Sequence, residues 1–365
     1  MSDKEQQSAE STKATEPPKP AAPPEMKRDG VAQPKATHVV KTFTHGGPLL
    51  SARFDPTGQF VFSAGQDYRI SRFTFPDGKR AVLPDEHDSW VRGLACTPDG
   101  STLLTGGYDG QLIWWPVADE KPTPIRKVAA HAGWIREVAV SPNGKLVATC
   151  GNDHLVKLWD AGNGKLVRQL KAHQHHVYNI AFHPDGGALI SNDLLGHFKH
   201  WEVGTGKLVR EFRQVQMHKY DEKFRADIGG ARGMAFNSDG SLLAASGITE
   251  VSNAFAGVGK PTVELIDWAT GKRVRRYVQG GKGVAWGVGL HSDHFLVAAY
   301  TGLLLFWSYA DSKLHHQAKI GSLAFDLSLH PDGLHVATAH HDGKVRISKM
   351  APKPKEDDKV DVAAT

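Results

Sequence analysis

Short segments in which apolar and polar residues alternate run through most of the chain, on either side of tight turns. Residues 135–140 (IREVAV) precede one such turn, and residues 146–149 (LVAT) follow it. Alternation with a period of two is typical of half-buried β-strands. The pattern therefore predicts an all-β protein built from many short strands.

The turns share a four-residue signature whose fullest form ends in Pro, Asp or Asn, and Gly. Proline fixes φ in such a turn, and glycine accepts a positive φ. The seven fourth positions are Gly58, Gly100, Gly144, Gly186, Gly240, His294 and Gly333. They are separated by 42, 44, 42, 54, 54 and 39 residues. Four short strands in a repeat of about 40–45 residues is the pattern of a β-propeller blade, so the sequence predicts a seven-bladed β-propeller.

The most regular repeat occupies residues 131–160. It contains His131, Thr149, Asp153 and Trp159, and the last of these is followed by aspartate. This unit resembles the WD-repeat (WD40) family, and seven such units in phase cover residues 37–349. In that family a buried tetrad of His, Ser or Thr, Asp and Trp joins three strands of a blade. The resemblance implies that these residues are structural and that none is catalytic.

The tetrad is expected to be complete in blades two and three, to lack its tryptophan in blade one and to erode in the later blades. Blade two matches with His87, Thr105, Asp109 and Trp115. Blade one keeps His45, Ser63 and Asp67 but has Phe73 where tryptophan is expected. In blades four to six, Leu195, Thr262 and Thr301 stand at the Asp position, whereas Trp201, Trp268 and Trp307 persist. Blade seven keeps Asp342 and has Ser348 at the Trp position.

The two ends of the propeller are expected to pair with each other. Residues 165–170 form the outer strand of blade three and precede His173 at the offset by which residues 38–43 precede His45. Since no comparable strand follows Ser348, residues 38–43 are expected to supply the outer strand of blade seven. Such pairing removes a sheet edge and closes the ring.

The segments outside the propeller, residues 1–36 and 350–365, are expected to be disordered tails. The first contains six prolines and almost no large apolar side chain. A segment of this kind buries too little surface to offset the entropy that ordering costs.

Composition narrows the functional classes. The chain has 365 residues, a formal charge of +5 and a pI of about 9.0, but the positive charge forms no stripe or patch of the kind that nucleic-acid binders show. The longest apolar stretch, residues 303–307, is far shorter than the roughly 18–20 residues of a spanning helix. The polar first ten residues do not resemble a secretory signal. Cys96 and Cys150 cannot form a disulfide framework, so we expect a reducing, cytoplasmic setting without membrane association.

Function is expected at the top face, which carries the loops between strands b and c and between successive blades. In the resembled family, residues in register with these loops surround the channel mouth and contact partners. Here aromatic residues and arginines, the types that dominate binding hot spots, are frequent among them. The candidate partner-binding residues are Trp90, Arg92, Tyr108, Trp134, Arg136, His176, Tyr178, Arg232, Trp286, Tyr300, Phe325, Tyr220 and Phe255.

The sequence thus favours a non-catalytic scaffold, monomeric or part of a larger complex, that binds protein or peptide partners. Because Arg92, Arg136 and Arg232 converge on one mouth, an anionic or phosphorylated peptide is a candidate partner. Two alternatives remain open: an enzyme that uses the channel mouth, and a propeller associated with nucleic acid. For the enzyme, Glu137 and Asp326 are expected to face each other across the channel.

No cofactor and no metal are expected. The histidines that cluster in the sequence are His175 with His176, His197 with His200, His315 with His316, and His340 with His341. Adjacent residues of a strand point to opposite faces, so the paired histidines are interpreted as structural or surface residues.

Two insertions are expected on the top face at blade five, within residues 211–223 and 248–260. They are 12 and 13 residues longer than the matching intervals of blade three. Surface loops tolerate such length, but two neighbouring insertions also favour a shared partner platform. Its expected apolar contacts are Met217, Tyr220, Phe224 and Phe255, and its expected cations are Lys219, Lys223 and Arg225.

Overall fold

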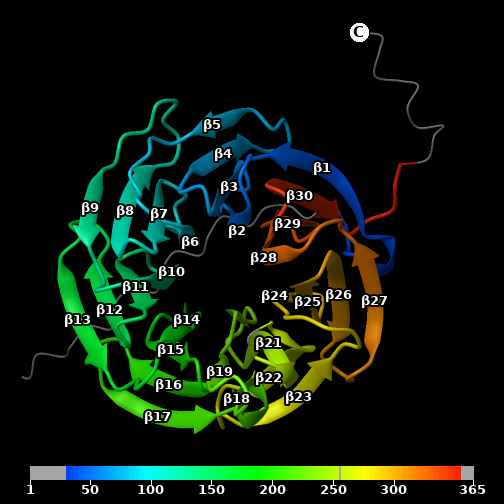
Figure 1. Cartoon of the computed structure of the whole chain (residues 1–365). Coiled ribbons are helices and arrows are strands. Elements are labelled where there is room, and N and C mark those ends of the chain that lie inside the picture. The colour runs from blue at the N-terminus through cyan, green and yellow to red at the C-terminus, as the bar shows by residue number, and fades with distance from the viewer. Residues whose placement is uncertain (1–29, 255, 355–365) are drawn as a thin grey trace, which may run out of the picture.

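The computed structural model describes residues 30–254 and 256–354. Seven four-stranded antiparallel sheets stand around a central axis (Figure 1), and an eighth, two-stranded sheet accompanies blade five. The predicted seven-bladed β-propeller is therefore confirmed. The only helices among the described residues are the single 3-10 turns η1 (Pro34–Ala36) and η2 (Val215–Met217), and neither has the length or apolarity to cross a membrane.

Strands a to d of each blade run from the channel outward. Blade one comprises β2 (Leu49–Phe54), β3 (Phe60–Gly65), β4 (Ile70–Thr74) and β5 (Arg80–Val82). Blade two comprises β6 (Val91–Cys96), β7 (Thr102–Gly107), β8 (Gln111–Pro116) and β9 (Arg126–Ala129). Blade three comprises β10 (Ile135–Val140), β11 (Leu146–Gly151), β12 (Leu155–Asp160) and β13 (Leu166–Lys171). Blade four comprises β14 (Val177–Phe182), β15 (Ala188–Asp193), β16 (His197–Glu202) and β17 (Leu208–Arg213).

Blade five comprises β20 (Gly233–Phe236), β21 (Leu242–Asn253), β22 (Val258–Asp267) and β23 (Arg273–Val278), and the accompanying hairpin is β18 (His218–Asp221) with β19 (Ala226–Gly229). Blade six comprises β24 (Gly287–His291), β25 (Phe295–Tyr300), β26 (Leu303–Ser308) and β27 (Leu314–Lys319). Blade seven comprises β28 (Ala324–Leu329), β29 (His335–His340), β30 (Lys344–Lys349) and β1 (His38–Thr44).

The seven repeated turns connect strand a to strand b at the bottom face. Six of their fourth residues are glycines with φ between 69° and 75°. In blade six His294 takes the same left-handed conformation, with φ of 61°. A non-glycine residue adopts this region at some cost, so the turn geometry is kept where the glycine is lost.

The ring closes through β1, as predicted. β1 pairs antiparallel with β30, and Phe43 lies opposite Val345. Residues on either side of these strands also contact the propeller: the Gln33 amide donates to the Met350 carbonyl at 2.7 Å, and Ala32 packs against blades six and seven. These three residues fall in the segments expected to be disordered. The rest of that expectation, for residues 1–29 and 355–365, lies outside the described residues.

The predicted tetrads of blades two and three are present. In blade three, His131 Nδ1 lies 2.8 Å from Asp153 Oδ1 and Nε2 lies 2.7 Å from Thr149 Oγ1. The Trp159 indole donates to the same hydroxyl at 2.9 Å. Blade two repeats these contacts with distances of 2.8–3.2 Å among His87, Thr105, Asp109 and Trp115. Each network satisfies buried polar atoms that water cannot reach.

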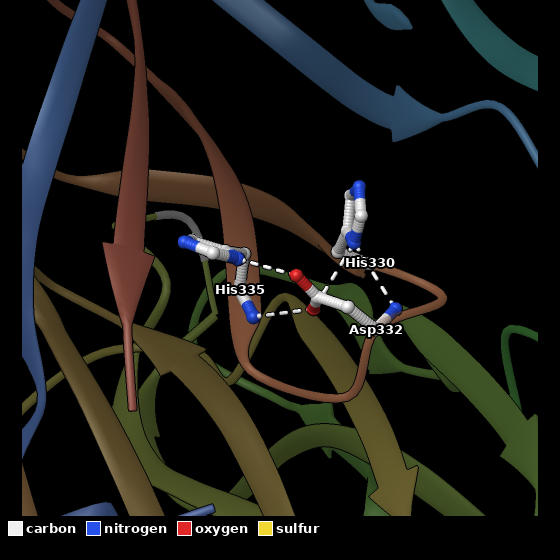
Figure 2. A group of neighbouring side chains, drawn as sticks. All are labelled: His330, Asp332 and His335. Carbon is white, nitrogen blue, oxygen red and sulfur yellow. Dashed lines mark hydrogen bonds and ion pairs between the residues drawn. The ribbon is translucent and has the colours of Figure 1, made fainter. Parts of the chain in front are cut away.

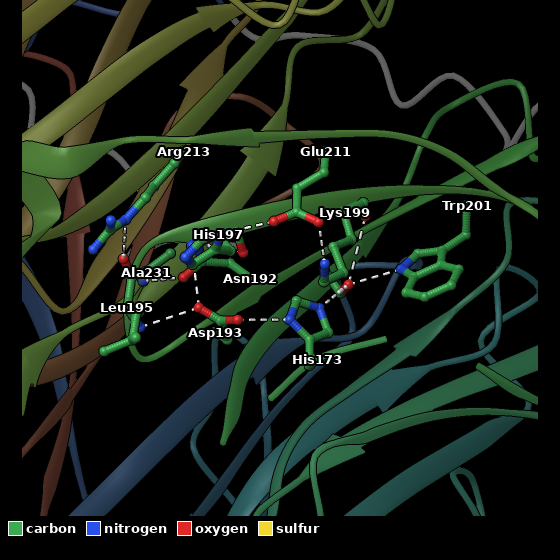
Figure 3. Close-up of polar contacts among 11 residues, drawn as sticks. His173, Asn192, Asp193, Leu195, His197, Lys199, Trp201, Glu211, Arg213 and Ala231 are labelled. Atoms are coloured by element: carbon green, nitrogen blue, oxygen red, sulfur yellow. Dashed lines mark hydrogen bonds and ion pairs between the residues drawn. The ribbon is translucent and has the colours of Figure 1, made fainter. Parts of the chain in front are cut away.

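Blade four corrects the expectation that its Asp is lost. His173 Nδ1 lies 2.8 Å from Asp193 Oδ2, and both His173 and Trp201 bond the Ser191 hydroxyl (Figure 3). Asp193 is the last residue of β15 and takes the strand position that Gly151 holds in blade three. The carboxylate therefore enters the same space from the strand, two residues earlier than Leu195.

In two other blades the residue at this last position of strand b also occupies the space of missing tetrad residues. In blade seven the position holds His340, whose Nε2 lies 2.7 Å from Thr338 Oγ1 and whose Nδ1 bonds the Ser322 carbonyl at 2.8 Å. Asp342 instead pairs with Arg346. In blade six the position holds Tyr300, because the turn after β25 is one residue shorter than its counterpart in blade three.

Blade five corrects a second expectation. The strand pairing places Ile266, and not Trp268, in register with Trp159. Trp268 lies one residue beyond β22 and packs on His183, His200 and Phe236 with ring centroids 4.4–5.1 Å apart. The length of the insertion between β21 and β22 was counted from Trp268. Because Ile266 is the residue in register, the insertion is shorter than that count.

Replacing Phe43 with alanine should test the ring closure. Phe43 is 7% exposed and its ring stacks on Phe73 at 5.2 Å, and deletion of a buried phenylalanine side chain costs about 3–5 kcal/mol. Chemical denaturation of Phe43→Ala should show a loss of this size. Val40→Ala, on the exposed face of the same strand, should change the free energy of unfolding by less than about 0.5 kcal/mol. Equal effects of the two changes would contradict closure through β1.

His340 should make the fold sensitive to mild acid. Burial lowers the pKa of His340 to about 4, below its ordinary value of 6.5. The unfolded chain therefore binds this proton more tightly, so stability is complete above pH 6.5 and falls as the pH drops towards 4. Between pH 7.5 and 5.0 we expect a loss of about 2 kcal/mol from this group, measured by urea unfolding. His340→Gln should have a shallower pH dependence, and an unchanged slope would contradict the assignment.

Candidate functional site

The central channel is lined by the first strand of every blade. Its cavity, of about 380 Å³, is bordered by Ser51, Glu137, Asn179, Gly233, Gly287 and Asp326, together with neighbours from the same strands. Glu137 and Asp326, which the sequence placed at the channel, are both among them. Small side chains dominate, so the few charged groups set the chemistry of the channel.

The two channel carboxylates differ in environment. Asp326 Oδ2 accepts hydrogen bonds from Ser51 Oγ at 2.7 Å, the Ala52 amide at 3.2 Å and Arg53 Nη2 at 3.3 Å. Burial raises the pKa of Glu137 to about 7, and the nearby guanidinium groups of Arg53 and Arg92 only partly oppose this rise. Asp326 is therefore a fixed partner of blade one, whereas Glu137 exchanges a proton near neutral pH.

Above the channel, aromatic rings and guanidinium groups from successive blades contact one another. Tyr108 stacks on Trp134 with centroids 4.2 Å apart and planes 4° apart, and Trp90 adjoins Tyr108 at 5.8 Å. The Arg136 guanidinium lies 4.7 Å from the Trp134 ring centroid and 4.5 Å from that of Tyr178. Blades two, three and four are thus joined by an uninterrupted line of cation–π and stacking contacts.

The line continues around the other side of the mouth. Arg232 lies 4.4 Å from the Tyr178 ring centroid and 5.4 Å from that of Trp286. Arg92 approaches Trp286 from across the channel at 6.0 Å. Trp286 meets Phe325 edge to face at 5.0 Å. We call these residues the mouth cluster: Trp90, Arg92, Tyr108, Trp134, Arg136, Tyr178, Arg232, Trp286 and Phe325.

A repeated backbone irregularity places many of these side chains. Strand a of five blades shifts register by one residue, at Leu50, Arg92, Arg136, Tyr178 and Phe325. A β-bulge leaves one residue unpaired and redirects its side chain. The register of the repeat placed these residues at the mouth, but the bulges themselves have no signal in the sequence.

The arginines of the mouth cluster have no ion-pair partner within 4 Å among the described residues. Arg136 Nε donates to Asn152 Oδ1 at 2.8 Å, and Arg92 Nη2 donates to the Arg232 carbonyl at 3.2 Å. Arg232 Nε is buried and has no hydrogen-bond partner in the described structure. Burial acts to raise the pKa of Tyr178, but the charges of Arg232 and Arg136 outweigh it and the pKa is lowered. The mouth is therefore electropositive.

The remaining predicted site residues lie in different surroundings. Trp90 and Trp134 are 38% and 41% exposed, as a contact surface requires. His176 adjoins the mouth cluster and bonds the Asn152 carbonyl. Tyr300 is only 6% exposed and its hydroxyl donates to the Lys282 carbonyl, which corrects its placement on the surface. Its one-residue shift in the strand turns the side chain inward. Phe255 lies outside the described residues.

The two insertions of blade five contact each other beside the mouth. Lys219 Nζ donates to the Val251 carbonyl at 2.7 Å, and the Ala254 amide donates to Asp221 Oδ2 at 2.9 Å. Ile228, Ile248, Val251 and Val284 form a small apolar cluster on which Trp286 also packs. The insertions are thus continuous with the mouth cluster.

The platform residues differ in exposure. Tyr220 and Phe224 are 50% and 38% exposed. Met217 is wholly buried among Ile190, Phe198 and Leu243, so the expectation that it contacts a partner is wrong. It anchors the first insertion to the propeller instead.

Comparison with known proteins identifies the repeats. A family model described as "WD domain, G-beta repeat" matches residues 37–71, 79–116, 122–160, 164–202 and 312–347, together just over half of the chain. The stretch between the fourth and fifth matches contains blade five and the first three strands of blade six. There Ala245 and Ala298 occupy the strand position of the tetrad hydroxyl, so these blades have departed furthest from the repeat pattern.

Two curated proteins illustrate the similarity. The chain is 26% identical to the protein groucho of Drosophila melanogaster over 144 residues. This aligned region covers 38% of this chain and 20% of that protein. It is 25% identical to the serine-threonine kinase receptor-associated protein of Bos taurus over 76 residues. This aligned region covers 21% of this chain and 22% of that protein. The chain therefore matches about a fifth of the length of each relative.

Replacing Glu137 with glutamine should stabilise the propeller at alkaline pH. The folded pKa of about 7 lies above the ordinary value of 4.5, so the carboxyl destabilises the fold increasingly as the pH rises between these values. At pH 8 we expect Glu137→Gln to be more stable than the wild type by about 1–3 kcal/mol. At pH 4.5 the two proteins should unfold at nearly equal urea concentrations. A difference that does not depend on pH would contradict the proposed environment.

Proposed function

The chain belongs to the WD-repeat family, and from this premise we propose that it is a non-catalytic scaffold that binds an acidic or phosphorylated peptide at the mouth cluster. The observation that carries the proposal is the set of three arginines held among aromatic rings without an acidic partner within 4 Å in the described structure. The protein does not neutralise the positive charge of these arginines, so this charge is available to an anionic ligand.

The chemistry of the arginines favours a phosphate or a carboxylate. A guanidinium presents paired N–H donors that match these groups in a bidentate manner. Arg136 and Arg232 are held by Tyr178 between them, so binding loses less side-chain freedom than it would with flexible arginines. The exposed indoles of Trp90 and Trp134 add apolar area for the residues that flank the anion.

The insertions of blade five extend this surface. Tyr220 and Phe224 are exposed on a hairpin whose partner insertion packs on Trp286. A peptide that places its anionic group over the arginines would reach these rings with adjacent residues. The name of the bovine relative, a receptor-associated protein, suits a role in protein association.

The alternative of an enzyme has less support. The hydrogen-bond donors around Asp326 belong to the propeller and fix its carboxylate. Proton transfer would therefore rest on Glu137, whose pKa burial raises to about 7. A nucleic-acid partner would show a steep dependence of affinity on salt.

The test is binding of a fluorescent phosphoserine peptide library and its unphosphorylated counterpart. We expect preferential binding of the phosphorylated library, and Arg136→Gln and Trp134→Ala should each weaken it at least tenfold, or about 1.4 kcal/mol. Both side chains are at least partly exposed, so thermal stability should change little.

Arg126→Gln is the matched control. Arg126 also lies over a tryptophan, 5.6 Å from the Trp114 ring centroid, but on the outer strand of blade two. This variant should bind as the wild type does. Equal binding by Arg136→Gln and the wild type, or no preference for the phosphorylated library, would overturn the proposed ligand.

A further inference from the structure

The bottom face carries histidines that link neighbouring blades. His183, His291 and His330 each begin the turn between strands a and b of their blade. The Nε2 atoms of these residues lie 3.1, 2.6 and 3.0 Å from the carbonyl oxygens of Gly240, Gly333 and Gly58, respectively. Each of these glycines lies in the turn of the following blade, and Gly58 belongs to blade one, so His330 spans the ring closure.

In blade seven this turn contains a second imidazole. His335 begins β29, three residues after Asp332, and its Nδ1 lies 2.6 Å from Asp332 Oδ2 (Figure 2). His330 Nδ1 lies 3.0 Å from Asp332 Oδ1. The ligand atoms of the three residues all lie within 4.8 Å of one another. In blade four the position that corresponds to His335 holds Ala188, so the cluster is particular to blade seven.

The hydrogen bond to blade one fixes the tautomer of His330. Because a carbonyl oxygen only accepts hydrogen bonds, Nε2 of His330 donates to Gly58. Nδ1 is then the acceptor nitrogen of the ring, and the Asp332 amide donates to it at 3.1 Å. Asp332 Oδ1 lies 3.0 Å from the same nitrogen. A metal bound to Nδ1 would replace the hydrogen bond from the amide and lie beside this carboxylate.

We propose that His330, Asp332 and His335 form a binding site for Zn²⁺ at the bottom face of blade seven. Two imidazole nitrogens and one carboxylate oxygen are ligands that zinc accepts in tetrahedral sites, and three protein ligands leave the fourth position to water or to a partner's side chain. Nitrogen donors select against Ca²⁺ and Mg²⁺, which prefer oxygen ligands.

The surroundings prepare these residues for a metal. The Gly58 carbonyl fixes the His330 tautomer that presents Nδ1, which is the usual role of a group behind a metal-bound histidine. Phe54 and Phe75 pack on the His330 ring at 4.7 and 5.1 Å. The Leu334 amide donates to Asp332 Oδ1 at 2.7 Å. Zinc–ligand bonds of about 2.0–2.2 Å place tetrahedral ligand atoms about 3.4 Å apart. Because the three ligand atoms already lie within 4.8 Å of one another, each pair has to close by at most about 1.4 Å.

A metal at this position would strengthen the ring closure. His330 belongs to blade seven and its ring is bonded to blade one, so a metal that fixes the ring also fixes the contact between the first and last blades. Ligands that bind only the folded state raise its apparent stability. The site lies on the face opposite the mouth cluster and does not depend on the proposed peptide binding.

Isothermal titration of the metal-free full chain with ZnSO₄ should test the site. We expect one zinc ion per chain at the tightest site and a rise in melting temperature on saturation. Replacement of zinc by Co²⁺ should give the visible absorption of a tetrahedral complex. His335→Gln should weaken binding at least tenfold and abolish the cobalt absorption, whereas His183→Gln, in the corresponding turn of blade four, should leave both unchanged.

Asp332→Asn provides a second variant in case His335→Gln folds poorly, and it should also weaken zinc binding at least tenfold. The proposal would be overturned if the wild type bound no zinc, or if both variants bound zinc as tightly as the wild type.

Discussion

The pairing of β1 with β30 determines whether this protein has a site at all. Residues of the mouth cluster come from blades two to seven, so they surround one opening only when the ring is closed. The closing strand is tied on its buried side by Phe43 against Phe73 and at its start by the contact of Gln33 with Met350. On the bottom face His330 bonds Gly58 across the same junction. Loss of this junction would expose a sheet edge and separate the residues on both faces.

The sequence predicted the architecture well because each blade repeats one set of local constraints. Turn chemistry, strand alternation and the spacing of the tetrads all indicated the same period, and agreement between levels is what makes such a prediction dependable. The number of blades and the closing strand followed from that period. The tetrads of blades two and three followed from the resemblance to the WD-repeat family.

The errors have a common physical cause. The space that the tetrad fills at the end of strand b must be occupied, but the protein fills it from different backbone positions: Asp193 in blade four, Tyr300 in blade six and His340 in blade seven. Counting residues along the repeat cannot find such substitutions. The space must be filled by a side chain of suitable volume and hydrogen bonding, and that side chain can come from more than one sequence position. The same reasoning explains why the bulges of strand a, which aim Arg92, Arg136 and Tyr178 at the mouth, were not foreseen.

The mouth cluster costs the free protein stability, and the proposed anionic ligand would offset part of that cost. Buried cations are costly unless they are paired, yet Arg232 is partly withdrawn from water and burial lowers its pKa, while its Nε lacks a partner in the described structure. The rings of Tyr178 and Trp286 offset part of this cost through cation–π contacts. An acidic side chain at a neighbouring mouth position would offset more, and the described residues place none within 4 Å. An anionic ligand would supply the missing charge, so the energy that the free protein forgoes is regained on binding.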